Sequence, residues 1–302
     1  MATPMTHRQI KDAIISKIGT ATWRKISHSI KFPPKSLWAT NRTRDFAEEM
    51  ILLTLYKDIF AVSYSELLTM VQPRLKLAKE SIQHNVKSTR KELRKWAKTI
   101  IVPDDSSCLS CVAASLDRPK PCDKVTLWID SSDFRAKGKQ SIHKDKSNWS
   151  HKLHSPGRRW LTIMNGKGAP QWISEFHKPT DYDGDLIIFY AKVIDEKFKG
   201  ETMIGDNHFK KAVDFLHKVT LISPRLNAGR HQVIDGKKVP RKLPEADQQH
   251  NSVISGVRGK VEAPYGWVKS QFYCLSQPFY EDANQHDCVI WTAFAVHRLM
   301  IS

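Results

Sequence analysis

The chain has 302 residues, enough for two domains, and its 40% hydrophobic and 26% charged residues are typical of a globular protein. No apolar run approaches the length that crosses a bilayer, the longest being residues 51–56 and 186–190, so we expect no membrane partner. The first ten residues hold no hydrophobic signal core, and five cysteines without a repeating framework favour a reducing compartment.

The net charge of +17 is concentrated near the N-terminus, where the first hundred residues carry 19 Lys and Arg against 8 acids. A cationic field of this size favours a polyanionic partner, and nucleic acid is the usual one. A merely solubilising surface remains the alternative, because charge alone does not separate the two.

Residues 1–101 are predicted to be helical. Residues 45–60 carry apolar side chains at helical spacing, and a short second helix is expected to begin at Ser63, which has capping-box spacing with Glu66. Pro73 suits the first turn of a third helix that extends to Ile100, with apolar residues in steps of three, four and seven.

The order helix, short helix, basic helix is that of a helix-turn-helix, which suits docking in the major groove. A plain helical bundle with a solvated basic face is the alternative. The cations on the outer faces of the third helix that we expect to bind DNA are Lys87, Arg90, Lys91 and Arg94.

Residues 102–123 are predicted to be a linker, because they are rich in Asp, Ser and Pro. Cys108, Cys111 and Cys122 give a weak zinc signal, since a structural zinc requires four closed positions. His143 is a candidate fourth ligand, but we expect no zinc site here.

Residues 124–302 alternate between strand-like and helix-like segments, which predicts an α/β domain. A turn at residues 165–168 is expected to join two strands as a hairpin. In chain order, we expect strands at 125–129, 160–164 and 172–176, a helix at 185–193, a strand at 201–205, a helix at 209–216, a strand at 219–223, a basic loop at 224–249, a largely helical segment at 250–275 and a helix at 289–300.

Three acids lie beside or within apolar runs, where an unpaired charge is costly. Asp130 and Asp206 follow expected strands, and Glu262 lies on an expected helix. Neighbouring strand ends would bring the first two together, and a packed helix would present the third. Such hard oxygen ligands suit Mg²⁺ or Mn²⁺.

Several neighbours compete for these roles. Asp133 and Asp145 are alternative carboxylates in the first region, and Asp133 could equally be structural. A hydrogen-bonded or surface role is favoured over a metal role for His208. Pro264 lies two residues after Glu262, where it marks either a kink or a restart of the helix.

Residues 255–272 resemble the third-acid helix of DDE-superfamily transposases, and they are most like the PIF/Harbinger-like branch. The hallmark there is an Arg, then Val-Glu, aromatic-Gly, Lys and Phe. The strings Asp130-Ser131-Ser132 and Gly205-Asp206 resemble the first and second acids of that family. Residues 52–57 and 63–67 resemble its helix-turn-helix region.

The resemblance implies an RNase H-like catalytic core at 124–302, a mixed sheet flanked by helices, after an all-helical DNA-binding region at 1–101. It also implies that Asp130, Asp206 and Glu262 hold two Mg²⁺ (or Mn²⁺) ions for cleaving and joining DNA strands at transposon ends and target. Arg258 would pair either with Glu262 or with a phosphate of DNA, and Lys269 would also meet DNA. A nuclear location follows from the family, and self-association and an accessory DNA-binding protein are left open as further features.

Two other functions remain open from the sequence. One is a transposase-derived DNA-binding protein without catalytic activity. The other is a metal-dependent nuclease unrelated to transposition.

Overall fold

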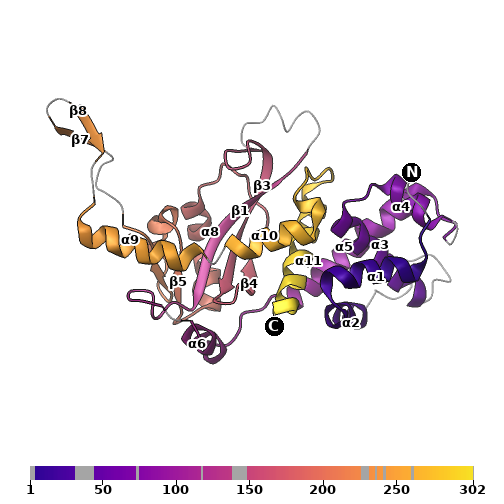
Figure 1. Ribbon diagram of the computed structural model, residues 1–302, viewed down its shortest axis with the longest axis horizontal. Coiled ribbons are helices and arrows are strands. Elements are labelled where there is room, and N and C mark those ends of the chain that lie inside the picture. The colour runs from indigo at the N-terminus through magenta and orange to yellow at the C-terminus, as the bar shows by residue number, and fades with distance from the viewer. Residues whose placement is uncertain are drawn as a thin grey trace.

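The computed structural model describes residues 4–30, 44–72, 75–116, 118–137, 148–225, 231–234, 237–240, 243–259 and 262–301. Figure 1 shows an elongated molecule, with the N-terminal helices at one end and a sheet between flanking helices in the middle. Within the described residues, no helix combines the length and apolarity that crossing a membrane requires.

The N-terminal region is helical, as predicted. It contains α1 (His7–Ile18), α2 (Thr20–Ser29), α3 (Arg44–Phe60), α4 (Tyr64–Val71) and α5 (Lys79–Ile100). The capping box starts α4, because the Ser63 hydroxyl accepts from the Glu66 amide at 3.2 Å and the Glu66 carboxylate accepts from the Ser63 amide at 2.7 Å. The third helix begins at Lys79, later than expected, and Pro73 lies outside the described residues.

Helix α5 packs against the C-terminal helix α11 (Ala283–Ile301), so the N-terminal helices and the rest of the chain share one hydrophobic core. The predicted linker contains a further helix, α6 (Ser106–Ala114), which buries Leu109 against the sheet region. The division of the chain at residues 101 and 124 therefore remains a proposal, and the shared core argues for a close association of the two parts.

The central sheet is mixed. Its strands are β1 (Leu127–Arg135), β2 (Trp149–Ser150), β3 (Ser155–Asn165), β4 (Pro170–Ile173), β5 (Thr202–Ile204) and β6 (Thr220–Ile222), in the order β2-β3-β1-β5-β6 with β4 paired to β3. The β1–β3 and β3–β4 pairs are antiparallel, whereas β5 is parallel to β1 and to β6. This arrangement, preceded by helices, confirms the predicted RNase H-like α/β fold.

Helices cover both faces of the sheet. One face packs against α8 (Asp183–Lys197) and the 3₁₀ helix η2 (Asn207–Phe215), through residues such as Ile129 and Leu161. The other face meets α9 (Glu245–Arg258), α10 (Glu262–Gln271) and α11, since Trp128 belongs to the same buried hydrophobic cluster as Val257, Val268 and Phe294. The indole N–H of Trp128 also donates to the carbonyl of Val257 at 3.0 Å. Successive strand residues alternate between the faces, so Asp130 lies on the same face as Trp128.

Two segments differ from the sequence-based expectation. The basic loop at 224–249 contains an antiparallel hairpin of β7 (His231–Ile234) and β8 (Lys237–Pro240), and α9 already begins within it. The helical segment at 250–275 is three elements: α9, α10 and the 3₁₀ helix η4 (Tyr273–Leu275). Pro264 is the third residue of α10, in the first turn, where its missing N–H has no intrahelical partner to lose. The helix therefore restarts there.

Candidate active site

The structure brings Asp130 and Asp206 together. Asp130 is the fourth residue of β1, so the prediction that it ends a short strand is wrong; all nine residues of β1 pair with β3. The parallel pairing of β1 with β5 stops at Trp128 and Ile204. Asp130 lies two residues after Trp128, and Asp206 lies two residues after Ile204. Both acids therefore lie where the two strands separate. Arg258, at the end of α9, places its Nη1 3.9 Å from Oδ2 of Asp206.

The Asp130 carboxylate lies in an unfavourable environment for a negative charge. Burial raises the pKa of Asp130 to about 6, and the nearby charge of Asp206 adds to the increase. The backbone amide of Ser131, 2.8 Å from Oδ1, and the charges of Lys152 and Arg258 oppose it. Two neighbouring carboxylates with incomplete compensation are a donor set that fits a divalent cation. Asp206 also caps η2, accepting from the amide of the exposed His208 at 2.8 Å.

Helix α10 is hydrogen-bonded to β1 beside Asp130 and Asp206. The Tyr265 hydroxyl donates to the main-chain oxygen of Asp130 at 2.8 Å. Lys269 donates through Nζ to the Ser132 hydroxyl at 3.1 Å and to the main-chain oxygen of Asp133 at 3.2 Å. Burial raises the pKa of Tyr265 well above its ordinary value, so its hydroxyl stays a donor at neutral pH.

Glu262, the first residue of α10, is exposed and does not join the pair. Among the described residues, no group of three or more His, Cys, Asp or Glu is close enough to hold a metal ion. The structure thus brings two of the three predicted acids together and leaves the third at the start of the adjacent helix. Residues 260–261, just before it, are not described.

The competing carboxylate Asp133 has a structural role. Arg159 donates to it through Nε at 2.7 Å and Nη2 at 3.1 Å, and the Ser150 hydroxyl donates at 2.6 Å. The same guanidinium donates to Asp183 at 2.8 Å, so this arginine ties β3 to β1 and to α8. Asp145 and His143 lie outside the described residues. Cys108 and Cys111 are exposed thiols, and Cys122 is buried.

Two of the predicted DNA contacts are at odds with the structure. Arg90 is 1% exposed and pairs with Asp58 and Glu281, so its guanidinium has no path to a phosphate. Lys269 is anchored to β1, and burial lowers the pKa of its ammonium group. The outer-face position predicted for Arg90 is wrong, because Arg90 lies among the buried residues of α5 and pairs with acids across the core. Lys269 is held instead by a hydroxyl and a main-chain oxygen of β1, which its helical spacing does not reveal.

The other predicted cations differ in exposure. Lys87 and Lys91 are exposed on α5. Arg94 is half-buried and forms ion pairs with Glu175 and Asp287, and Arg258 is half-buried beside Asp206. Helical spacing puts His84, Lys95 and Lys98 on the same exposed side of α5 as Lys87 and Lys91.

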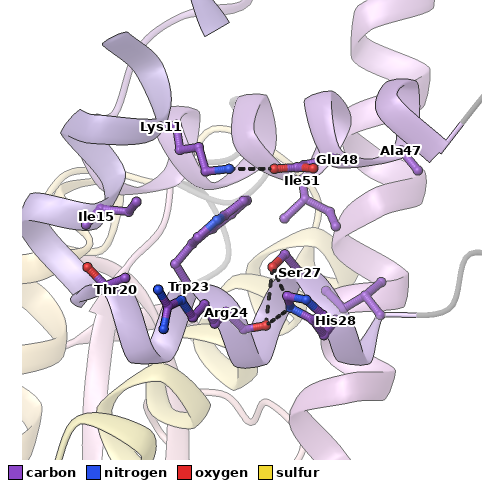
Figure 2. Close-up of a pocket in the computed structure, with 11 residues that line it drawn as sticks. Lys11, Ile15, Thr20, Trp23, Arg24, Ser27, His28, Ala47, Glu48 and Ile51 are labelled. Carbon is purple, nitrogen blue, oxygen red and sulfur yellow. Dashed lines mark hydrogen bonds and ion pairs between the residues drawn. The ribbon is translucent and has the colours of Figure 1, made fainter. Parts of the chain in front are cut away.

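A separate cavity of about 680 Å³ lies between α1, α2 and α3. Figure 2 shows Trp23 in its middle, Arg24 and His28 below, and the ion pair of Lys11 with Glu48 above it, at 2.9 Å. None of the three predicted acids is among its described lining residues, so we assign it no part in the carboxylate site.

Sequence reasoning missed Lys152, Tyr265 and Arg159. Lys152 comes from the turn between β2 and β3, which the Ser150–Asp133 bond holds near β1. Tyr265 is the aromatic residue of the third-acid motif, but nothing in the sequence indicates that its hydroxyl reaches the backbone of the first acid.

Residues 129–298 match the DDE superfamily endonuclease family, which is more than half of the chain. The chain therefore belongs to the DDE superfamily endonucleases. Comparison with curated proteins finds no match. Among solved structures, the chain is similar to the piggyBac transposase in a synaptic complex with hairpin DNA: 15% identity, 97% of this chain and 72% of that chain covered, TM-score 0.46. A similarity at that level supports no further conclusion.

Proposed function

We propose that this chain is a DDE-type transposase/endonuclease that cleaves DNA strands, and joins them to a target, by two-metal-ion phosphodiester chemistry. The observation that carries the proposal is the proximity of the Asp130 and Asp206 carboxylates where β1 and β5 separate. Both acids lie within the segment that matches the family. Asp130, Asp206 and Glu262 are the proposed catalytic residues and metal ligands, with Mg²⁺ or Mn²⁺ as the ion.

When bound, divalent ions activate the attacking oxygen and stabilise the leaving oxygen. The chain supplies the rest of the environment. Asp130 offers a half-buried carboxylate whose charge is under-compensated, and Asp206 offers a second one beside it. Arg258 approaches from α9, 3.9 Å from Asp206, and its planar donors suit a phosphate of the cleaved strand. Water or a 3′-hydroxyl would be the nucleophile.

The helical phase of α10 supports Glu262 as the third ligand. Residues 262, 265 and 269 follow the i, i+3, i+7 pattern, which keeps them on one side of a helix. Tyr265 and Lys269 both contact β1 from that side. Glu262 therefore begins the same side of the helix, one turn before the residue that touches Asp130.

The proposed DNA interface is the exposed side of α5 together with Arg258. A row of cations spaced by three and four residues, Lys87, Lys91, Lys95 and Lys98, can follow a phosphate backbone without reading bases. The net charge of +17 agrees with such a partner. We further propose that the protein belongs to the PIF/Harbinger-like branch, acts on transposon ends in the nucleus, and binds DNA through the α3–α5 helix-turn-helix.

A second candidate function is a DNA-binding protein that descends from such an enzyme and no longer cleaves. The exposed position of Glu262, away from the other two acids, favours it. The same basic surface would then serve binding alone.

Nicking of supercoiled plasmid in Mg²⁺ or Mn²⁺ separates the two. Wild type should nick, whereas Asp130→Asn, Asp206→Asn and Glu262→Gln should not, and each should still bind DNA. Glu196→Gln, which removes an exposed acid on α8, is the matched control and should nick like wild type. If wild type and all four variants are equally inactive, the binding-protein function holds. Joining of a labelled donor end to a target plasmid then distinguishes a transposase from a plain nuclease.

A further inference from the structure

One aromatic and two basic side chains lie together beside Asp206. The ring of Tyr182 meets the ring of His208 edge-on, with centroids 5.6 Å apart and an interplanar angle of 77°. The ammonium Nζ of Lys211 lies over the Tyr182 ring, 5.1 Å from its centroid. The backbone amide of His208 donates to Oδ1 of Asp206 at 2.8 Å, which ties the cluster to the second acid. We call these three side chains, Tyr182, His208 and Lys211, the η2 patch.

The η2 patch is held by the close packing of two helix starts. Tyr182 is the N-cap residue of α8, and Asp206 is the N-cap residue of η2. Gly184 lies between them, and a Cβ there would stand 2.6 Å from the carbonyl oxygen of His208 and 2.7 Å from Cε1 of Tyr182. A larger residue at position 184 would therefore push the two helix starts apart. The packing of the backbone sets the position of the ring.

All three side chains of the η2 patch reach solvent. Tyr182 is 36% exposed, and His208 and Lys211 are exposed as well. Partial burial raises the pKa of Tyr182, and the negative charge of the nearby Asp206 adds to the increase. The patch therefore presents an aromatic ring and two basic groups to solvent next to a candidate catalytic carboxylate. Bases stack on such rings, and phosphates bind such cations.

An unpaired strand suits this chemistry better than a duplex does. In a duplex the bases stack on one another, so a protein ring finds no free base face, and phosphate contacts alone need no aromatic residue. The exposed lysines of α5 illustrate the contrast, because that helix, described along its whole length, exposes no Phe, Tyr or Trp. A row of cations of that kind suits a duplex backbone, whereas a ring beside a cation is typical of surfaces that bind single strands.

We propose that the η2 patch binds an unpaired DNA strand beside the carboxylate pair, with a base stacked on Tyr182 and a phosphate held by Lys211 and His208. This inference rests on DNA being the substrate, which is part of the proposed function. It does not require Glu262 or a metal ion to join the pair. Tyr182 is then a substrate-binding residue, and the chemical step belongs to other groups.

The test measures DNA binding by fluorescence anisotropy in EDTA, so that the result does not depend on a metal site. The probes are an end-labelled oligo(dT) strand and a labelled duplex of the same length. Tyr182→Ala should weaken single-strand binding by about fivefold or more, the effect of one lost base–aromatic stack, and change duplex binding by less than about twofold. Tyr182→Phe keeps the ring and should bind like wild type. Lys211→Gln should reduce the slope of log K for the single strand against log salt by about 0.7.

Tyr280→Ala is the matched control. Tyr280 is 70% exposed and has Lys137 over its ring at 4.9 Å, so it offers the same combination of ring and ammonium group. Lys137 lies seven residues beyond Asp130 along the chain, about 20 Å in an extended conformation. Tyr280→Ala should therefore bind both probes like wild type.

The outcomes separate this inference from the proposed function. Wild type that binds both probes, with a Tyr182→Ala variant of equal single-strand affinity, overturns the η2 patch alone. Equal weakening of both probes by Tyr182→Ala overturns the assignment to an unpaired strand. Wild type that binds neither probe overturns the proposed function and the inference together. A protein that binds the single strand through Tyr182 but does not nick plasmid in Mn²⁺ overturns the catalytic function and supports the inference.

A second variant covers a failure of Tyr182→Ala to fold, as judged by thermal unfolding. Lys211 is exposed on η2, so Lys211→Gln removes its charge without opening the core. An unchanged salt slope for the single strand in Lys211→Gln would then overturn the proposal.

Discussion

Replacing Asp130 by Asn should stabilise the metal-free protein at neutral pH while abolishing cleavage. The pKa of Asp130 rises from 3.8 to about 6 on folding, mainly because the carboxyl is buried. About two pKa units correspond to about 3 kcal/mol of differential interaction between the two protonation states. Asn keeps an oxygen for the Ser131 amide and carries no charge, so it removes this penalty.

The pH dependence follows from the sign of the shift. Because the folded-state pKa lies above the unfolded one, the folded protein binds more protons between the two values, and its stability falls as pH rises through that window. Below about pH 4 both states are protonated and the penalty is absent; above about pH 6 it is complete. Asp130→Asn should therefore gain up to about 3 kcal/mol over wild type at pH 7.5, and little at pH 4.

Urea unfolding in EDTA at pH 4 and pH 7.5 measures this difference, with Glu196→Gln as the control for loss of an exposed charge. Saturating Mn²⁺ at pH 7.5 should stabilise wild type and not Asp130→Asn. An Asp130→Asn variant with the same unfolding midpoint as wild type at pH 7.5 would refute the claim that the half-buried Asp130 carries an under-compensated charge.

Three other changes test the surroundings. Gly168→Ala should lower stability by about 1–2 kcal/mol, because φ is positive there and the new methyl meets Pro264; thermal unfolding measures it, and an unchanged midpoint contradicts the close packing. Arg90→Met should cost about 3–5 kcal/mol by removing the arginine that pairs with the buried Asp58, while Glu281 keeps Lys57 and Tyr64 as partners; an unchanged stability in urea would argue that Asp58 finds another partner. Lys87→Gln with Lys91→Gln should reduce the slope of log K for duplex DNA against log salt by about 2, and an unchanged slope removes α5 from the interface.

The helical N-terminal region and the order of strands and helices after residue 124 could be predicted because their signals are local. The Ser63–Glu66 capping box starts α4 as expected, since its two bonds involve residues only three apart. The turn at residues 165–168 likewise joins β3 to β4. Boundaries were less predictable. β1 continues past Asp130 because β3, distant in sequence, pairs with all of it, and apolarity alone does not reveal that pairing.

The identity of the candidate acids came from the sequence, since Asp130, Asp206 and Glu262 were selected by their place beside apolar runs and by the motif around Glu262. Their grouping did not. Asp130 and Asp206 meet because two parallel strands separate at that level, whereas Glu262 depends on where α10 is seated.

The amino-acid sequence by itself determined that this is a basic protein with an α/β region after residue 124, and it singled out three acids in strings that resemble those of the DDE superfamily. Tertiary structure alone decided which charges face a partner and which hold the fold together. Arg90 and Lys269 are cations on helices like Lys87, yet both are sequestered. The physical reason is that a charged side chain is held by the groups it contacts in the folded protein. Those groups are distant in the sequence, so local patterns do not reveal them.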